Sequence, residues 1–311
     1  EEMGYFNFEA KMNENGNIKI NGLLHDKEYV LTETKPADGF VSATDISFML
    51  KLKIEKADYL TQIFIKENEK FVPAISNKLV MYDDTTKIEF SKTEITGEKE
   101  IPGCELEVTD KETGRIMDKW TSSKDKHIVE GKYVVGKTYM FTEKRPASGF
   151  ATAESVEFKI SDTGNIQQVS MKDDTIKIQF SKIASDTKKL LPGAKYKVLD
   201  SKGKKVCEFT TKKKETALNG ILCAGETYTF VEHQAPKHYK KAKNVKITVK
   251  DTGKIQKIKV VDERIPEVPD TPQTGYNKSI YLYVLALLFG IGMLAKCLNV
   301  KNRYRKKQDE E

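Results

Sequence analysis

The sequence contains few of the residues from which metal and nucleotide sites are built. Its 311 residues include four cysteines, four histidines and one tryptophan. The cysteines show no CxxC or other metal-ligand spacing, which argues against a zinc module. No Gly-rich phosphate loop of the GxGxxG or GxxxxGKS/T type is present, which removes the commonest nucleotide-binding classes. We therefore expect neither a metal nor a cofactor.

The chain also lacks sustained helical periodicity before residue 278. After that point comes an uncharged run of sixteen residues, Ile280 to Ala295, which Cys297, Leu298 and Val300 extend. A basic cluster follows in residues 301–311. The basic cluster directly after the apolar run predicts that residues 280–300 span a membrane. The tail is then cytoplasmic, and residues 1–275 lie outside the cell. A buried core helix is the alternative, and the basic residues that directly follow the apolar run argue against it.

Positive charge is concentrated in one part of the chain. Residues 175–266 carry 22 Lys/Arg against 9 Asp/Glu, whereas the preceding residues carry more acidic than basic side chains. Such a segment can hold an anionic wall polymer, and the alternative is a solvated lysine-rich face. It shows neither a helical recognition pattern nor an aromatic stacking motif, so we expect no nucleic-acid partner.

The body of the chain is a repeat. TTKIEFSK, ending at Lys92, recurs as DTIKIQFSK, ending at Lys182, a separation of 90 residues. IPGCELEV recurs as LPGAKYKV, and DTGNIQQVSMKDD recurs as DTGKIQKIKVVDE. The segment GKTYMFTEKRPASGF recurs as GETYTFVEHQAPKHY, and an earlier copy reads DKEYVLTETKPADGF. The chain therefore holds two complete modules preceded by an incomplete one.

Apolar residues inside each module alternate with polar ones, as in Ile88/Phe90 and Tyr139/Phe141. This period of two indicates half-buried strands, and turn signals separate them. The fold class expected is all-β, with tandem antiparallel β-sandwiches followed by a transmembrane helix. Cys104 is expected to be a small buried side chain, and Cys207 and Cys223 unpaired packing residues.

These motifs resemble the Cna B-type, or SpaA-type prealbumin-like, modules of Gram-positive surface proteins. The resemblance covers nearly all of residues 5–266. It divides the chain into the following parts: 1–84, a partial module lacking its first strand; 85–174, a complete module; 175–265, a basic module; 266–279, a Pro-rich linker; 280–300, the span; and 301–311, the tail. In the third module His238 and Tyr239 replace Gly-Phe, so we expect its loop to turn differently.

A lysine, a glutamate and an aspartate recur in fixed phase. The two sets are Lys92, Glu143 and Asp173, then Lys182, Glu232 and Asp262. Each lysine and glutamate continues the alternation of its strand, so they are predicted to face the core. Burial favours the neutral amine and the neutral acid, the forms that an amide-forming condensation requires. The incomplete module retains only Glu33 and Asp83.

The resemblance implies the chemistry of these sets. The lysine amine attacks the aspartate carboxyl, the glutamate shuttles the proton, water leaves, and an intramolecular isopeptide bond joins the first and last strands. Asp174 is a less favoured acceptor, because its strand parity is opposite to that of Asp173. A buried but unreacted ion cluster is the alternative.

The end of the chain resembles a cell-wall sorting signal, which consists of an LPxTG-like pentapeptide, an apolar segment and a positive tail. The pentapeptide is Thr271, Pro272, Gln273, Thr274 and Gly275, with Thr271 where the family usually has Leu. The resemblance implies that a sortase cuts after Thr274 and joins it to peptidoglycan. A simple uncleaved membrane anchor is the alternative.

Together these features predict a non-enzymatic stalk on a Gram-positive cell wall. We expect the chain to be a fragment of a longer secreted protein, whose upstream region contacts a host or matrix ligand. The histidines occupy non-equivalent repeat positions and pair with no Ser or Cys in a recurring way, so a hydrolytic triad is not expected. The alternatives are a sortase-polymerised pilus subunit and the stalk of an exported enzyme.

Overall fold

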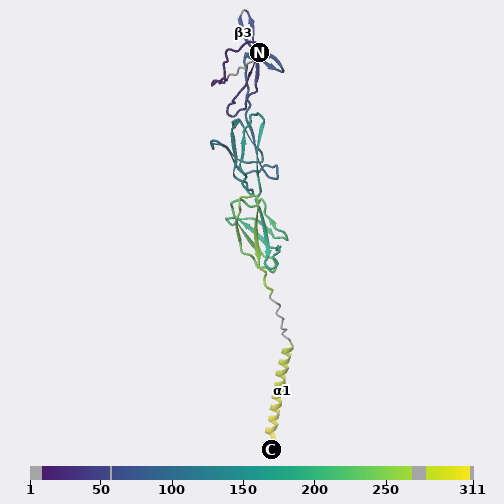
Figure 1. The fold of residues 1–311 in the computed structure, drawn as a ribbon. Helices are drawn as coiled ribbons and strands as arrows, with labels where there is room; N and C mark the ends of the chain where they lie inside the picture. The colour runs from purple at the N-terminus through teal and green to yellow at the C-terminus, as the bar shows by residue number, and fades with distance from the viewer. Residues whose placement is uncertain (1–8, 57, 268–277, 309–311) are drawn as a thin grey trace.

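The computed structural model describes residues 9–56, 58–267 and 278–308. Three β-rich modules follow one another along the chain and lie end to end (Figure 1). The sorting pentapeptide, residues 271–275, lies outside the described residues. A long helix, α1 (Lys278–Gln308), forms the C-terminal part. Within it Leu282–Arg303, 22 residues, is long and apolar enough to cross a membrane.

The first module contains one four-stranded sheet in the order β1-β2-β3-β4. Its strands are β1 (Glu28–Leu31), β2 (Ile46–Glu55), β3 (Asp58–Glu67) and β4 (Lys70–Pro73), followed by the short 3-10 turn η1 (Ile75–Asn77). This module is longer than the other two between its glutamate and its aspartate, where Glu33 to Asp83 spans 50 residues and the corresponding spans are 30. The β2–β3 hairpin and β4 lie in this longer segment. Its buried apolar side chains are few, among them Val41 and Phe48.

The second module is a two-sheet sandwich, with one sheet in the order β10-β9-β6-β7 and the other in the order β11-β5-β8. The strands are β5 (Lys87–Glu94), β6 (Glu105–Asp110), β7 (Ile116–Thr121), β8 (His127–Glu130), β9 (Thr138–Arg145), β10 (Val156–Lys159) and β11 (Ile166–Asp173). Alternation places Ile88, Phe90, Tyr139 and Phe141 in one core between the sheets.

The third module repeats this architecture, with sheets in the orders β15-β12-β18 and β14-β13-β16-β17. Its strands are β12 (Lys177–Ala184), β13 (Lys195–Leu199), β14 (Lys205–Thr210), β15 (Thr216–Ala217), β16 (Thr227–Gln234), β17 (Val245–Thr248) and β18 (Ile255–Asp262). Phe180, Tyr196 and Phe230 lie at the centre of its core, with the rings of Phe180 and Tyr196 4.7 Å apart. The predicted all-β tandem architecture is confirmed.

One detail differs from a purely antiparallel sandwich. The first and last strands of each complete module pair in parallel, β5 with β11 and β12 with β18. Parallel pairing is possible because the rest of the module lies between these two strands and serves as the crossover. The first and last strands of a module are therefore neighbours, and the chain enters at one end of this pair and leaves at the other.

The loop that ends at Tyr239 was expected to turn differently from its counterparts, but the structure shows the same turn. Tyr239 forms an antiparallel bridge with Arg264, as Phe150 does with Thr175. His238 takes the left-handed conformation of Gly149, with φ of 67° against 87°. The prediction is wrong because histidine can adopt this conformation, although at greater cost than glycine.

Candidate functional site

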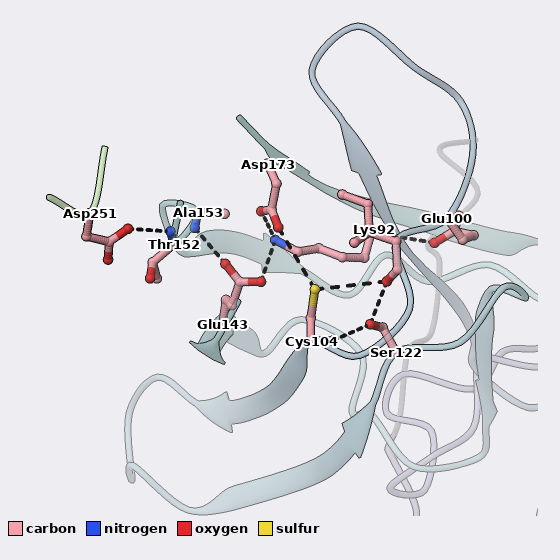
Figure 2. A network of polar contacts seen from close by, with 10 residues as sticks. Lys92, Glu100, Cys104, Ser122, Glu143, Thr152, Ala153, Asp173 and Asp251 are labelled. Atoms are coloured by element: carbon pink, nitrogen blue, oxygen red, sulfur yellow. Dashed lines mark hydrogen bonds and ion pairs between the residues drawn. The ribbon is translucent and has the colours of Figure 1, made fainter. Parts of the chain in front are cut away.

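The parallel strand pair positions the lysine and aspartate of module two. Lys92 lies on β5 directly opposite Met171 of β11, and Asp173 follows two residues later on the same face. Both side chains point into the core, where Lys92 is 2% and Asp173 1% exposed. The ammonium nitrogen of Lys92 donates a hydrogen bond to Oδ1 of Asp173 (Figure 2). First and last strands are thus in direct side-chain contact.

The glutamate approaches from the other sheet. Glu143 lies on β9, and its Oε1 is 3.1 Å from Nζ of Lys92. Its second oxygen, Oε2, accepts a hydrogen bond from the backbone N–H of Ala153 at 2.7 Å. This backbone contact fixes the carboxyl group so that one oxygen faces the lysine (Figure 2). One basic and two acidic groups therefore share an almost dry interior.

Module three repeats the arrangement. Nζ of Lys182 donates to Oδ1 of Asp262 and lies 3.0 Å from Oε2 of Glu232. That same Oε2 accepts the backbone N–H of Ala242 at 2.7 Å. Among the described residues, Oε1 of Glu232 and Oδ2 of Asp262 are buried without a hydrogen-bond partner. Leaving a buried carboxylate oxygen unpaired is costly, which favours a protonated or a covalently modified carboxyl group.

The electrostatics of both sites shift the aspartate toward its neutral, protonated form. The pKa of the Asp173 carboxyl is raised to about 6, chiefly by burial, with Lys92 opposing the rise and Glu143 adding to it. Burial likewise raises the pKa of Asp262, with Glu232 acting in the same direction. Two carboxyl groups this close resist ionising together. A protonated aspartate beside an amine is the pair of reactants from which an amide can form.

The two sites differ in their remaining neighbours, which the recurring sequence phase did not reveal. In module three the hydroxyl of Tyr196 accepts a hydrogen bond from Nζ of Lys182 at 2.7 Å. Leu106 occupies the equivalent position on β6 of module two. There, Sγ of Cys104 lies 3.9 Å from Oδ2 of Asp173, while Ala194 takes its place in module three. The inward strand parity of Tyr196, shared with Val198, is the sequence signal that could have identified it.

Asp174, the less favoured acceptor, lies outside the site. Its carboxylate is half-buried and forms an ion pair with Lys177 at 2.7 Å. The cysteines are free among the described residues: Cys104 is buried, whereas Cys207 and Cys223 are partly exposed. Burial raises the pKa of the Cys104 thiol to about 11, so it is a neutral packing group at physiological pH.

Module one contains only part of the arrangement. Oε2 of Glu33 accepts the backbone N–H of Ala43 at 2.9 Å, matching the contact that Glu143 and Glu232 make in the other modules. Asp83 is exposed, and in the described part of the chain no contact joins it to Glu33. A half-buried glutamate held by its backbone partner is what this module retains.

The family comparison agrees with the two complete modules. Residues 86–175 and 176–264 each match the family of SpaA prealbumin-like fold domains. These two matches cover more than half of the chain. The chain therefore belongs to the SpaA family of prealbumin-like fold domains. None of the curated proteins compared with the chain matches it.

Several solved structures are similar to parts of the chain. The TIE protein of Bacillus anthracis is 17% identical, with a TM-score of 0.36, over 76% of this chain and 51% of that protein. The shaft pilin SpaA of Lactobacillus rhamnosus GG is 16% identical, with a TM-score of 0.30, over 59% of this chain and 99% of the pilin. A C-terminal fragment of the pilus adhesin SpaC of the same organism is 14% identical, with a TM-score of 0.33, over 59% and 99%.

Proposed function

We propose that the chain is a non-enzymatic stalk of a bacterial cell-surface protein, whose complete modules are each closed by a lysine–aspartate isopeptide bond. The observation that carries this proposal is the contact of a buried lysine amine with a buried aspartate carboxyl, made twice at equivalent positions. Two buried groups of this kind are costly as an ion pair, and an amide removes both charges.

The reaction is a balanced condensation. The neutral amine of Lys92 attacks Cγ of the protonated Asp173 carboxyl, a carbon–nitrogen bond forms, and the carbon–oxygen bond to the hydroxyl breaks. The hydroxyl leaves as water after it has gained one proton from the lysine nitrogen. Glu143 accepts a proton from the attacking nitrogen and returns it to the departing oxygen. The 3.1 Å separation between its Oε1 and Nζ of Lys92 suits this transfer. Glu232 has the same role between Lys182 and Asp262.

The mass of the intact chain tests the proposal. With both bonds formed, the chain is lighter than its sequence mass by two water molecules, and fragments linking residues 92 to 173 and 182 to 262 are found. The Glu143→Ala chain should be lighter than its sequence mass by only one water, because module two lacks its proton carrier and module three still forms its bond. The Glu232→Ala chain should likewise lose one water, from module two, and the double variant should have the full sequence mass. A wild-type chain at its sequence mass would refute the isopeptide proposal.

We further infer that the C-terminal segment anchors the stalk. The apolar helix of 22 residues and the basic tail behind it support temporary residence in a membrane. The pentapeptide Thr271–Gly275 supports sortase transfer from Thr274 to peptidoglycan, which leaves the helix behind. Cells making the wild-type chain should release it only on digestion of the wall. A chain carrying Thr274→Ala should instead be extracted by detergent, and identical extraction of both would contradict wall anchoring.

A pilus subunit is the other assembly that these modules would suit. It differs from a stalk in forming covalent oligomers between chains. A ladder of sortase-dependent bands on a denaturing gel would assign the chain to a pilus, whereas a single wall-attached species supports the stalk.

A further inference from the structure

The junctions between consecutive modules repeat the same contacts. At the first junction the backbone N–H of Ser42 donates to Oδ1 of Asp162 at 2.8 Å. At the second junction the N–H of Thr152 donates to Oδ1 of Asp251, also at 2.8 Å (Figure 2). Each aspartate begins an Asp-Thr-Gly turn of the later module. The same turn thus binds the same backbone position of the preceding module twice.

A glycine lies at the centre of each junction. Gly39 and Gly149 have φ of +90° and +87°, a conformation that favours glycine. The space beside each of them is also filled: a Cβ added to Gly39 would overlap the carbonyl oxygen of Gly131, and one added to Gly149 would overlap that of Gly220. A side chain at this position therefore cannot fit while the next module is docked.

Apolar packing continues across the second junction. Ala151 follows β9 of module two in the chain, yet it is 5% exposed and belongs to the buried cluster that forms the core of module three. Its N–H donates to the carbonyl of Asp174 at 2.9 Å. Val41, the equivalent residue of module one, is equally buried and makes the same hydrogen bond to Asp84. At the second junction the end of the earlier module thus completes the core of the next.

The corresponding end of module three has the same backbone but different side chains. The N–H of Lys240 donates to the carbonyl of Glu263 at 2.8 Å, as Ala151 does to Asp174. The three junction positions are occupied by His238, Lys240 and Lys241, in place of glycine, a small apolar residue and Ser or Thr. His238 and Lys240 are exposed. The side chains of this face suit solvent rather than another module.

We propose that one face of a module, formed in module two by Gly149, Ala151 and the N–H of Thr152, is a docking surface for a following prealbumin-like module. On module three, His238 and Lys240 occupy the equivalent positions and prevent such docking. The partner it accepts is recognised by an Asp-Thr-Gly turn and a glycine carbonyl. The array consequently behaves as one stiff unit across its two junctions and ends at module three.

A native cysteine reports on the second junction. Sγ of Cys223 lies 3.1 Å from Oγ of Ser148 across the interface, and its side chain is half-buried. We expect maleimide to label Cys223 of the full chain slowly in detergent micelles. Gly149→His, which introduces the residue of the closed face, should accelerate this labelling at least tenfold. Ala151→Lys should act in the same direction, while Cys104 and Cys207 keep their wild-type rates in both variants.

Two further variants separate docking from general damage. Gly114→Ala imposes similar backbone strain, since Gly114 has φ of +70°, but nothing lies within 4 Å of its added Cβ, so Cys223 should remain slow. Asp251→Ala changes only an exposed turn and should speed amide exchange at Thr152. The proposal is overturned if Cys223 is labelled as fast in the wild type as in Gly149→His. It is also overturned if Asp251→Ala leaves exchange at Thr152 unchanged.

Discussion

At the scale of single residues, the two buried sites hold the same three reactive groups in different surroundings. Lys182 has three polar neighbours, because Tyr196 joins Glu232 and Asp262. Within the described part of the chain, Nζ of Lys92 contacts only the two acids, and Leu106 fills the place of the tyrosine. The tyrosine hydroxyl orients the amine of Lys182 relative to Asp262, so the two modules should not react at equal rates.

Replacing this hydroxyl tests its role as a positioning group. Tyr196→Phe keeps the aromatic packing against Phe180 but leaves Nζ of Lys182 with one partner fewer. We expect the link between residues 182 and 262 to form about tenfold more slowly, because the roughly 1.5 kcal/mol at the lower end for one hydrogen bond to a charged group corresponds to about that factor. Mass spectrometry of newly refolded chain, sampled over time, gives the rate. The module-two link serves as the internal control and should be unaffected.

The raised pKa of Asp173 predicts a pH dependence of unlinked module two. The unlinked state is available in Glu143→Ala. In the folded state the pKa of Asp173 lies above the usual value of 3.8, so folding favours the protonated acid. The contribution of this carboxyl to stability is therefore complete below about pH 4 and declines as pH rises through the folded pKa.

Trp120 is the single tryptophan of the chain and lies in module two, so its fluorescence follows the unfolding of that module alone. The margin to measure is the urea midpoint of Glu143→Ala minus that of Glu143→Ala/Asp173→Asn, and it should fall between pH 4 and pH 7. A margin that grows with pH would show that ionised Asp173 is the stabilising form.

At the scale of strands, the parallel pairing of β5 with β11 decides what a cross-link can achieve. The bond would close a loop of about 80 residues that contains nearly the whole module. Restricting the unfolded chain over such a loop contributes about 4.5 kcal/mol by the chain-entropy estimate used for disulfides. The same pairing places the first and last strands side by side, with the chain entering at one end of the pair and leaving at the other. A pull on the chain therefore shears the two strands, and a bond between them would carry the load.

Loss of the bond should therefore lower the stability of module two by about 4.5 kcal/mol. Urea unfolding of Glu143→Ala, compared with the wild type through Trp120 fluorescence, measures this change. Module three provides a matched control, since Glu232→Ala should leave the Trp120 transition in place. An unchanged midpoint in Glu143→Ala would mean that the bond does not stabilise module two.

At the scale of the whole molecule, two docked junctions and, with both proposed bonds formed, two closed modules would make a tether that transmits force without lengthening. Residues 92 and 173 are separated by 81 positions. If they are linked, those positions cannot extend under tension. At about 3.5 Å per residue, releasing them would lengthen the chain by roughly 280 Å.

Single-molecule pulling distinguishes the two states. The wild-type chain should show no extension step of this size from modules two and three. Glu143→Ala should show one such step and the double variant with Glu232→Ala two. Steps of full module length in the wild type, beyond the one that unlinked module one gives, would contradict a mechanical role for the bonds.

Much of the fold and of the buried sites was predictable from the sequence. The alternation of apolar residues fixes which face of a strand is buried, and so the strand pattern alone assigns Lys92, Glu143 and Asp173 to the core. The repeat supplied the same assignment for the second set, and the uncharged run followed by basic residues marked the helix. These features depend on local periodicity and on spacing along the chain, which a sequence carries directly.

Other features were decided only by the tertiary structure. The parallel register of β5 and β11, the hydroxyl of Tyr196 on Lys182, and the contact of Asp251 with Thr152 all join residues that lie far apart in the chain. The left-handed turn at His238 is likewise followed by the bridge between Tyr239 and Arg264. Side-chain identity alone predicted a different loop. Such contacts arise from the packing of whole sheets and modules against one another. A local pattern does not specify which distant partner an atom meets.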